Sequence, residues 1–258
     1  MSPPRLFVDA DLAEDLVFDL ADGQAHYLGT VLRRAAGDAV ALFNGRHGEW
    51  EGQIAAIGKG RCRVRLRRRL RAQEAESPLH LVFAPVKRAR IDYLVEKATE
   101  LGVASLTPVA TERTVVERIN RERLRAHAVE AAEQSERLTV PVLHEPRGLP
   151  ALLADWPAGR PLFLCDESGA APGIGTVLAG FAPPPAGAAM LTGPEGGFTD
   201  SELDALTKLP FVKPVGLGPR VLRADTAALA ALAVFQALAG DWRQARLRRA
   251  PAALSPHR

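Results

Sequence analysis

The chain has few cysteines and few aromatic residues, and both shortages narrow the classes of protein it can be. Its 258 residues include two cysteines, Cys62 and Cys165. Two cysteines are too few for a disulfide framework or a zinc site, which favours a reducing cytosol. Aromatic residues make up 5% of the chain. A base-stacking platform of the kind that binds single-stranded nucleic acid is therefore not indicated.

Long apolar runs are also missing. The longest, residues 227–239, includes Gln236 and is shorter than the roughly 20 residues that a membrane-spanning helix needs. It therefore predicts a buried helix. The N-terminal residues lack the apolar stretch of a signal peptide. We expect a cytoplasmic protein that has no membrane partner.

The patterns of several common functional sites are absent as well. The six histidines show no metal-ligand spacing, and no Ser–His–Asp or Cys–His set indicates nucleophilic catalysis. No Gly-x-Gly-x-x-Gly motif follows the first α/β strand, and no phosphate-binding loop ends in Gly-Lys-Ser/Thr. These absences predict no metal site and disfavour simple NAD or ATP binding.

Basic residues, in contrast, are plentiful and clustered. Eight of them, and no acidic residue, lie between Lys59 and Arg71. Over residues 61–70 arginines alternate with apolar side chains, which predicts a strand with one basic and one apolar face. Arginine binds phosphate well, so this face is a candidate nucleic-acid surface; the alternative is a solvated face in an Arg-rich protein. The candidate RNA-binding residues are Arg33, Arg34, Arg61, Arg63, Arg65 and Arg67.

Residues 1–73 read as β-rich. Their strand signals fall at residues 5–8, 39–44, 49–57 and 61–70. Between the first two, residues 26–34 indicate a helical turn with Tyr27 and Val31 facing inward, and Leu28 and Leu32 as further candidates for the inner face. We expect a small β-barrel-like domain over 1–73, followed by a polar linker.

From residue 79 onward the pattern changes to strands that alternate with helices. The strand signals fall at residues 79–86, 104–110, 161–166, 187–192 and 212–217. Asn120 is expected to cap a helix that runs to about Leu138, and Thr199 and Glu202 have capping-box spacing. The alternation predicts an α/β domain over 74–258, with a parallel sheet and helices on both faces. Residues 243–258 form a basic tail.

Two glycine-rich turns follow directly after predicted strands, at residues 192–198 and 216–223. In parallel α/β sheets ligands bind in the crevice beyond the carboxyl ends of the strands. Glycine lets backbone amides approach a ligand without a β-carbon in the way. Together the turns predict one pocket. The alternative is that each is only a tight connection between a strand and a helix.

Two arginines, Arg220 and Arg223, stand at the entrance of the last helix. Cations at a helix N-terminus oppose its dipole, so this placement suggests that they hold an anion or a polar base edge. The alternative is a surface salt bridge to Asp225 or Glu195. Thr226 is expected either to cap the helix or to donate a hydrogen bond to a ligand.

Both turns, with their flanking residues, resemble the cofactor motifs of the ribosomal RNA small subunit methyltransferase E family. The motifs are Leu-Thr-Gly-Pro-Glu-Gly-Gly-Phe at 191–198 and Leu-Gly-Pro-Arg-Val-Leu-Arg-Ala-Asp-Thr-Ala at 217–227. The resemblance also includes parts of residues 26–38, residues 92–102 and parts of residues 130–137, and it ends at about Asp241. Asp225 stands where the family more often has Glu.

The resemblance implies a SPOUT-class methyltransferase. It implies an N-terminal PUA-like RNA-binding β-barrel and a C-terminal α/β domain with a trefoil knot and cofactor pocket at about 187–241. The implied reaction is S-adenosyl-L-methionine-dependent methylation of N3 of one uridine in 16S ribosomal RNA of the small ribosomal subunit. A homodimer is implied too, with the pocket at or near the subunit interface.

The resemblance places the cofactor on both turns. The implied cofactor-binding residues are Leu191, Thr192, Gly193, Glu195, Gly196, Gly197, Leu217, Gly218, Val221, Leu222, Arg223 and Thr226. Arg223 and Asp225 are the catalytic candidates: Arg223 would stabilise negative charge on the uracil, and Asp225, Glu195 or Glu112 would accept the proton. Two competing functions are a non-catalytic RNA-binding ribosome assembly factor and a SPOUT enzyme that methylates a ribose 2′-hydroxyl.

Overall fold

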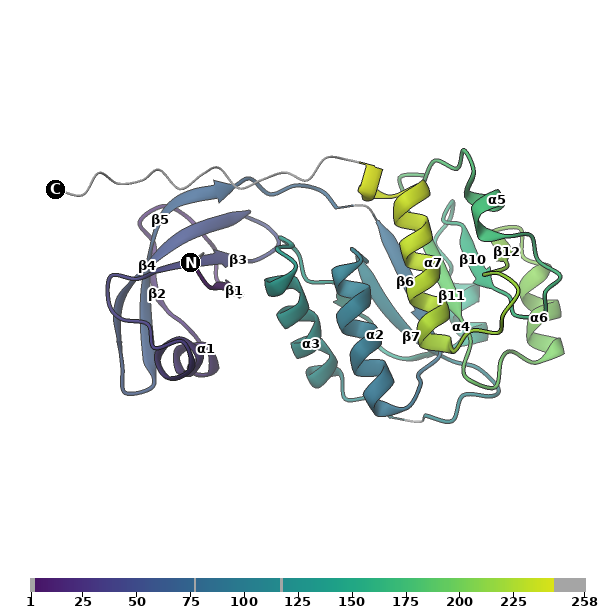
Figure 1. Cartoon of the computed structure of the whole chain (residues 1–258), viewed down its shortest axis with the longest axis horizontal. Coiled ribbons are helices and arrows are strands. Elements are labelled where there is room, and N and C mark those ends of the chain that lie inside the picture. The colour runs from purple at the N-terminus through teal and green to yellow at the C-terminus, as the bar shows by residue number, and fades with distance from the viewer. Residues whose placement is uncertain (1–2, 77, 117, 244–258) are drawn as a thin grey trace. The chain divides into compact units, whose positions relative to one another are not determined.

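The computed structural model describes residues 3–76, 78–116 and 118–243 (Figure 1). These residues form two compact units. The first contains residues up to 75 together with 132–139, and the second contains 76–131 and the residues from 140 onward. Most of the predicted basic tail, residues 244–258, lies outside the described residues.

The first unit is built on a five-stranded sheet with the order β1-β3-β4-β5-β2. Its strands are β1 (Arg5–Phe7), β2 (Val17–Asp19), β3 (Ala39–Phe43), β4 (Glu49–Gly58) and β5 (Arg61–Arg71). The first pair, β1 and β3, is parallel, and the others are antiparallel. Among the described residues β1 and β2 stand at the two edges, so the hydrogen-bonded sheet is open.

The alternation predicted for the basic strand is confirmed. In β5 the side chains of Cys62, Val64 and Leu66 are fully buried, and the arginines between them are exposed. The apolar side chains belong to the core of the first unit. This core fixes the strand's orientation, because a shift of one residue would bury the arginines.

The helical turn after β2 differs from its prediction. The helix α1 (Asp22–His26) starts earlier than expected and continues as a π-helix over Tyr27–Val31. Tyr27 and Val31 are exposed, whereas Leu28 is fully buried and Leu32 packs against the core, which confirms the inward placement of these two leucines. The inward placement of Tyr27 and Val31 is therefore wrong, because the wider π-helical turn breaks the spacing of an α-helix that the prediction assumed.

A buried carboxylate, Glu49, organises the first unit. Its Oε1 lies 2.5 Å from Nε of Arg5 and its Oε2 lies 2.8 Å from Nε of Arg71. Both arginines also donate to backbone carbonyls at the end of helix α3 (Arg121–Gln134) and just beyond it. The acceptors are Ala132, Glu133, Glu136 and Arg137. Cations at a helix C-terminus are favourable, and here a single carboxylate holds two of them in place.

The second unit contains a parallel sheet with the order β12-β10-β11-β6-β7-β8, and β9 pairs with β7. Its strands are β6 (Leu79–Phe83), β7 (Ser105–Ala110), β8 (Val142–Leu143), β9 (Arg147–Gly148), β10 (Leu162–Cys165), β11 (Ala188–Thr192) and β12 (Val212–Val215). Besides α3, its helices are α2 (Arg88–Glu100), α4 (Leu149–Ala154), α5 (Ile174–Leu178), α6 (Asp200–Thr207) and α7 (Ala224–Leu238), and a short 3-10 helix covers Asp241–Arg243. The predicted parallel sheet is confirmed. The short elements β2, β8, β9, α4 and α5 were not predicted.

Helices cover both faces of this sheet, as expected. Leu81 and Phe83 of β6 lie in one apolar cluster with residues of α2 and α7, and these two helices pack against each other (Figure 1). Val82, between them, belongs to a second cluster with Leu152 of α4 and Leu206 of α6. No helix among the described residues has the length and apolar character to cross a membrane.

The predicted N-caps of α3 and α6 are confirmed, but α3 is shorter than predicted. Thr199 and Glu202 form a capping box at the start of α6, and Asn120 Oδ1 accepts a hydrogen bond from the Arg123 amide at the start of α3. The helix α3 ends at Gln134 and does not reach Leu138. Glu136 has φ of +62°, a left-handed conformation that an α-helix cannot contain.

We predict that Glu49→Gln destabilises the protein by about 3 kcal/mol, because it leaves two largely buried guanidinium groups without their counter-charge. Glu51→Gln on the same strand is the matched control. Its partner Arg68 lies 2.8 Å away in an exposed pair, which is worth less than about 1 kcal/mol. Urea unfolding followed by circular dichroism measures both changes. Equal effects of the two substitutions would contradict the role given to Glu49.

Candidate functional site

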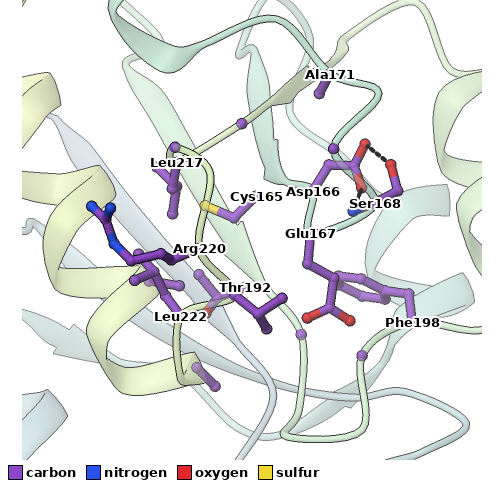
Figure 2. Close-up of a pocket in the computed structure, with 18 of the residues that line it drawn as sticks. Cys165, Asp166, Glu167, Ser168, Ala171, Thr192, Phe198, Leu217, Arg220 and Leu222 are labelled. Atoms are coloured by element: carbon purple, nitrogen blue, oxygen red, sulfur yellow. Dashed lines mark hydrogen bonds between the residues drawn. The ribbon is translucent and has the colours of Figure 1, made fainter.

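Three neighbouring strands of the second unit end at one edge of the sheet, and the loops that follow them line a single cavity (Figure 2). Leu164 of β10 lies opposite Leu191 of β11 on one side and Pro214 of β12 on the other. The cavity has a volume of about 700 Å³. The two glycine turns that the sequence placed at this edge are thus brought together, and the loop after β10 joins them.

Most of the residues implied to bind a cofactor line this cavity. They are Thr192, Gly193, Glu195, Gly197, Leu217, Gly218, Val221, Leu222 and Arg223. Three others lie elsewhere. Leu191 is fully buried in the core, Thr226 is exposed in the first turn of α7, and Gly196 packs against the Arg113 side chain.

Sequence reasoning missed the third wall of the cavity. The end of β10 contributes Cys165, and the loop after it contributes Asp166, Glu167, Ser168, Gly169, Ala171 and Gly173. The Asp166 carboxylate folds this loop by accepting hydrogen bonds from the amide and the hydroxyl of Ser168, at 2.8 and 2.9 Å (Figure 2). The strand was predicted correctly, so the rule that placed the glycine turns at the sheet edge would also have placed this loop there.

Close contacts with neighbouring side chains are found at two of the glycines. Gly197 has φ of +69°, and a β-carbon there would run into the Glu167 carboxylate. A β-carbon at Gly193 would lie 2.9 Å from the Phe198 ring. Another residue at Gly197 would need a strained backbone angle, and a side chain at Gly193 would require the Phe198 ring to shift.

Backbone hydrogen bonds also join the loops after β10 and β12. The Gly216 amide donates to the Pro172 carbonyl at 2.8 Å, and the Gly216 carbonyl accepts from the Ile174 amide at 2.9 Å. Because these bonds are made by the main chain, they fix the two walls relative to each other whatever the side chains are.

Charges of opposite sign line different parts of the cavity. The loops after β10 and β11 contribute the carboxylates of Asp166, Glu167 and Glu195, and the loop after β12 contributes Arg220 and Arg223. Figure 2 shows Arg220 on one side and Asp166 and Glu167 on the other. The cavity therefore suits a ligand that carries charges of both signs.

The alternative in which these arginines pair with nearby carboxylates is not observed. In the described part of the chain no ion pair joins Arg220 or Arg223 to Asp225 or Glu195. Asp225 instead lies 3.8 Å from a terminal guanidinium nitrogen of Arg90. Its Oδ1 is buried and accepts no hydrogen bond from the described residues.

The three candidate proton acceptors have different surroundings. Glu195 is exposed and lines the cavity. Asp225 is absent from the lining and faces Arg90. The Glu112 carboxylate lies 3.4 Å from the Ser201 hydroxyl, and Glu112 does not line the cavity either. Of the three, Glu195 lines the cavity, and Asp225 and Glu112 do not.

The candidate RNA-binding arginines lie in the first unit. Arg61 and Arg65 are exposed, Arg67 hydrogen-bonds Gln53, and Arg63 holds both carboxylate oxygens of Asp19 at 2.8 and 3.0 Å. This hydrogen bond from Arg63 lowers the pKa of Asp19. Arg33 is exposed and Arg34 is half-buried. In the described ranges no three His, Cys, Asp or Glu side chains are grouped to hold a metal ion.

One thiol lines the cavity. Burial raises the pKa of Cys165 to about 12, and desolvation also raises the pKa of Cys62. Since the thiolate is the reactive form of cysteine, the raised pKa makes Cys165, a half-buried wall residue, a weak nucleophile.

We therefore predict that native protein at pH 8 resists alkylation by iodoacetamide. At a pKa near 12 only about one Cys165 thiol in ten thousand is ionised at this pH. Both cysteines should be alkylated within minutes in urea, which serves as the control. Mass spectrometry of the intact protein counts the added groups. Rapid labelling of Cys165 in the folded protein would show that its thiol is not desolvated.

Comparisons with known families agree with the site. The RNA methyltransferase domain family matches residues 73–236, and the RNA methyltransferase PUA domain family matches residues 20–67. The first match includes all three loops of the cavity, and the second includes most of the sheet of the first unit.

Individual relatives resemble nearly the whole chain. Ribosomal RNA small subunit methyltransferase E of Rickettsia conorii is 34% identical over 91% of this chain and 95% of that protein. The same enzyme of Synechocystis is 33% identical over 91% of this chain and 77% of that protein.

Solved structures agree in fold. The methyltransferase E of Neisseria gonorrhoeae bound to S-adenosyl methionine has a TM-score of 0.84 and 28% identity, over 93% of this chain and 100% of that one. A putative methyltransferase of Legionella pneumophila with bound cofactor SAM has a TM-score of 0.80 and 30% identity, with the same coverage. The chain therefore belongs to the ribosomal RNA small subunit methyltransferase E family of RNA methyltransferases.

Proposed function

We propose that this chain is an S-adenosyl-L-methionine-dependent enzyme that methylates N3 of a uridine in 16S ribosomal RNA. The observation that carries the proposal is the cavity at the sheet edge, formed by the loops after β10, β11 and β12. Its glycine turns hold the motifs of the family, and the Neisseria gonorrhoeae relative was solved with S-adenosyl methionine bound.

The residues of the cavity fit this cofactor. A volume of about 700 Å³ lies within the range of small-molecule sites. Phe198, Leu217 and Leu222 offer apolar surface, and the glycines expose backbone groups that can accept or donate hydrogen bonds. The carboxylates of the loops after β10 and β11 complement positively charged groups. When bound, the cofactor supplies an electrophilic methyl group.

The chain's own residues would bind and activate the uridine. N3 carries a weakly acidic N–H on the Watson–Crick edge, so the base must be unpaired or flipped out to react. Arg223 lines the cavity and has no ion-pair partner among the described residues, which leaves its guanidinium available to stabilise negative charge on the uracil. Glu195, the one of the three candidate acceptors that lines the cavity, is the proposed proton acceptor.

Asp225 receives a different role. It lies in the first turn of α7, where a carboxylate favours the helix dipole, and it faces Arg90 at 3.8 Å. We assign it to holding the start of α7, and with it Arg223, the N-cap residue of that helix. The shorter side chain, Asp where the family more often has Glu, fits a contact with Arg90 better than a reach into the cavity.

The RNA partner is assigned to the first unit as well as to the cavity. The PUA domain match covers residues 20–67, and the exposed arginines of β5 offer a row of cations that suits a phosphate backbone. We propose that residues 1–73 form a PUA-like, barrel-shaped RNA-binding domain and that residues 74–258 form the SPOUT methyltransferase domain.

A homodimer, a trefoil knot at about 187–241 and a cytoplasmic location complete the proposal. Exposed apolar side chains support the dimer: Val221, at the cavity, is 79% exposed, and Tyr93 of α2 and Leu238 of α7 are 50% and 41% exposed. A partner subunit that covered Val221 would also close the cavity.

The backbone bonds of Gly216 to the loop after β10 support the knot, because threading requires those segments to lie side by side.

We predict that Arg223→Ala lowers turnover by about 100-fold, the usual cost of removing one donor that stabilises transition-state charge. The melting temperature should stay nearly unchanged, because the guanidinium has no ion-pair partner to lose among the described residues. Lys213→Ala, on the exposed side of β12, removes a cation away from the cavity and should leave turnover intact. A variant that melts early but keeps its activity per folded molecule would make Arg223 structural.

The function itself is tested by incubating the protein and S-adenosyl-L-methionine with unmodified 16S ribosomal RNA and, separately, with small ribosomal subunits. Digestion to nucleosides and mass analysis should reveal N3-methyluridine with at least one of the two substrates. A ribose-methylated nucleoside would instead indicate a 2′-O-methyltransferase. No methylated product, with no calorimetric heat from the cofactor, would indicate a binding factor for ribosome assembly.

A further inference from the structure

An arginine outside the cavity contacts the glycine turn that forms one of its walls. Arg113 follows β7, and one of its terminal guanidinium nitrogens donates to the carbonyls of Gly196 and Phe198, at 2.9 and 3.2 Å. Gly197, between the two acceptors, and Phe198 both line the cavity, whereas Arg113 does not. Arg113 therefore contacts this wall from outside.

The turn that carries Arg113 is itself fixed. The Thr111 amide donates to the Thr114 hydroxyl at 2.9 Å, and the Thr114 amide donates to the Thr111 carbonyl at 3.1 Å. These two bonds close a tight turn around Glu112 and Arg113. An arginine on a closed turn needs less ordering to reach its acceptors than one on an open loop.

A second contact joins this turn to the same wall. The Glu112 amide donates to Oε1 of Glu202 at 2.8 Å. The other carboxylate oxygen of Glu202 accepts from the Thr199 amide, which completes the capping box of α6. The wall is thus held at residues 196–198 by Arg113 and at its junction with α6 by Glu202.

The aliphatic part of Arg113 packs along Gly196. A β-carbon at Gly196 would lie 3.6 Å from Cβ and Cδ of Arg113, an ordinary van der Waals contact. This packing leads the guanidinium to the two carbonyls. One guanidinium nitrogen makes both bonds, and lysine would keep the charge while replacing the planar guanidinium with an ammonium group.

We propose that Arg113 is a positioning residue for the cofactor pocket: it holds residues 196–198 in the conformation that lines the cavity. The nature of the ligand rests on the proposed function; the effect on the loop does not. Glu112, one of the candidate proton acceptors from the sequence, supports the same wall through its backbone amide, which donates to Glu202.

The test compares Arg113→Met, which keeps the aliphatic packing and removes the donors, with Arg113→Lys, which keeps the charge. Hydrogen–deuterium exchange of the ligand-free protein measures directly how well the amides of residues 196–198 are protected. Calorimetry with S-adenosyl-L-methionine measures the affinity of the pocket for the cofactor. Arg147→Ala is the matched control. Like Arg113, Arg147 donates to a backbone carbonyl, that of Ala151, and it also donates to the Asp155 carboxylate, but it does not contact the cavity.

Arg113→Met should speed amide exchange in a peptide covering residues 193–199 and raise the cofactor Kd roughly tenfold, the loss expected for a charge-assisted hydrogen bond. The KM for the cofactor should rise while kcat at saturation changes little. Arg113→Lys should give a smaller change in the same direction, and Arg147→Ala none. Arg113→Lys also serves as the test if the methionine variant is unstable.

Two results would overturn the proposal. One is that both Arg113 variants show the same amide exchange and the same cofactor affinity as the wild-type protein. The other is an equal change in Arg147→Ala, which would mark a general loss of stability. If the wild-type protein binds no S-adenosyl-L-methionine, the proposed function fails, and the exchange data alone decide whether Arg113 holds the loop.

Discussion

The parallel pairing of β10 with β11 and β12 is the constraint on which the candidate site depends. Leu164 stands between Leu191 and Pro214 in register, so the three strands end at nearly the same level. Their loops must then turn at the same edge, and three loops that are far apart in sequence form one cavity. None of the loops forms that cavity alone, which is why the site follows from the sheet and not from any single motif.

The conformation of the walls needs further contacts. Gly197 adopts a backbone angle that few other residues tolerate, the loops after β10 and β12 exchange main-chain hydrogen bonds, and Arg113 supports the wall from outside. Such a cavity is largely formed before a ligand arrives, so less of the binding energy is lost in ordering it. The separation of carboxylates from arginines is then a stable property of the site.

The sequence predicted the longer strands, the parallel sheet, the caps and the meeting of the two glycine turns, because each follows from local periodicity or from residues with restricted backbone angles. The loop after β10 was left out of the predicted pocket, although the strand before it was predicted, and Tyr27 was misplaced, because a π-helix replaced the expected α-helix. The contacts of Arg113 and Glu49 could not be predicted from the sequence. Arg113 contacts carbonyls 83 and 85 positions away, and Glu49 contacts arginines 44 and 22 positions away. No pattern in the sequence pairs such distant residues.

Hydrogen–deuterium exchange with and without S-adenosyl-L-methionine tests the central claim most directly, namely that three strand-end loops form one cofactor site. The account predicts slower exchange on binding in peptides covering residues 165–173, 192–198 and 216–224 together, and little change in β5 of the first unit. Protection of only one of these loops, or protection confined to other parts of the chain, would contradict it.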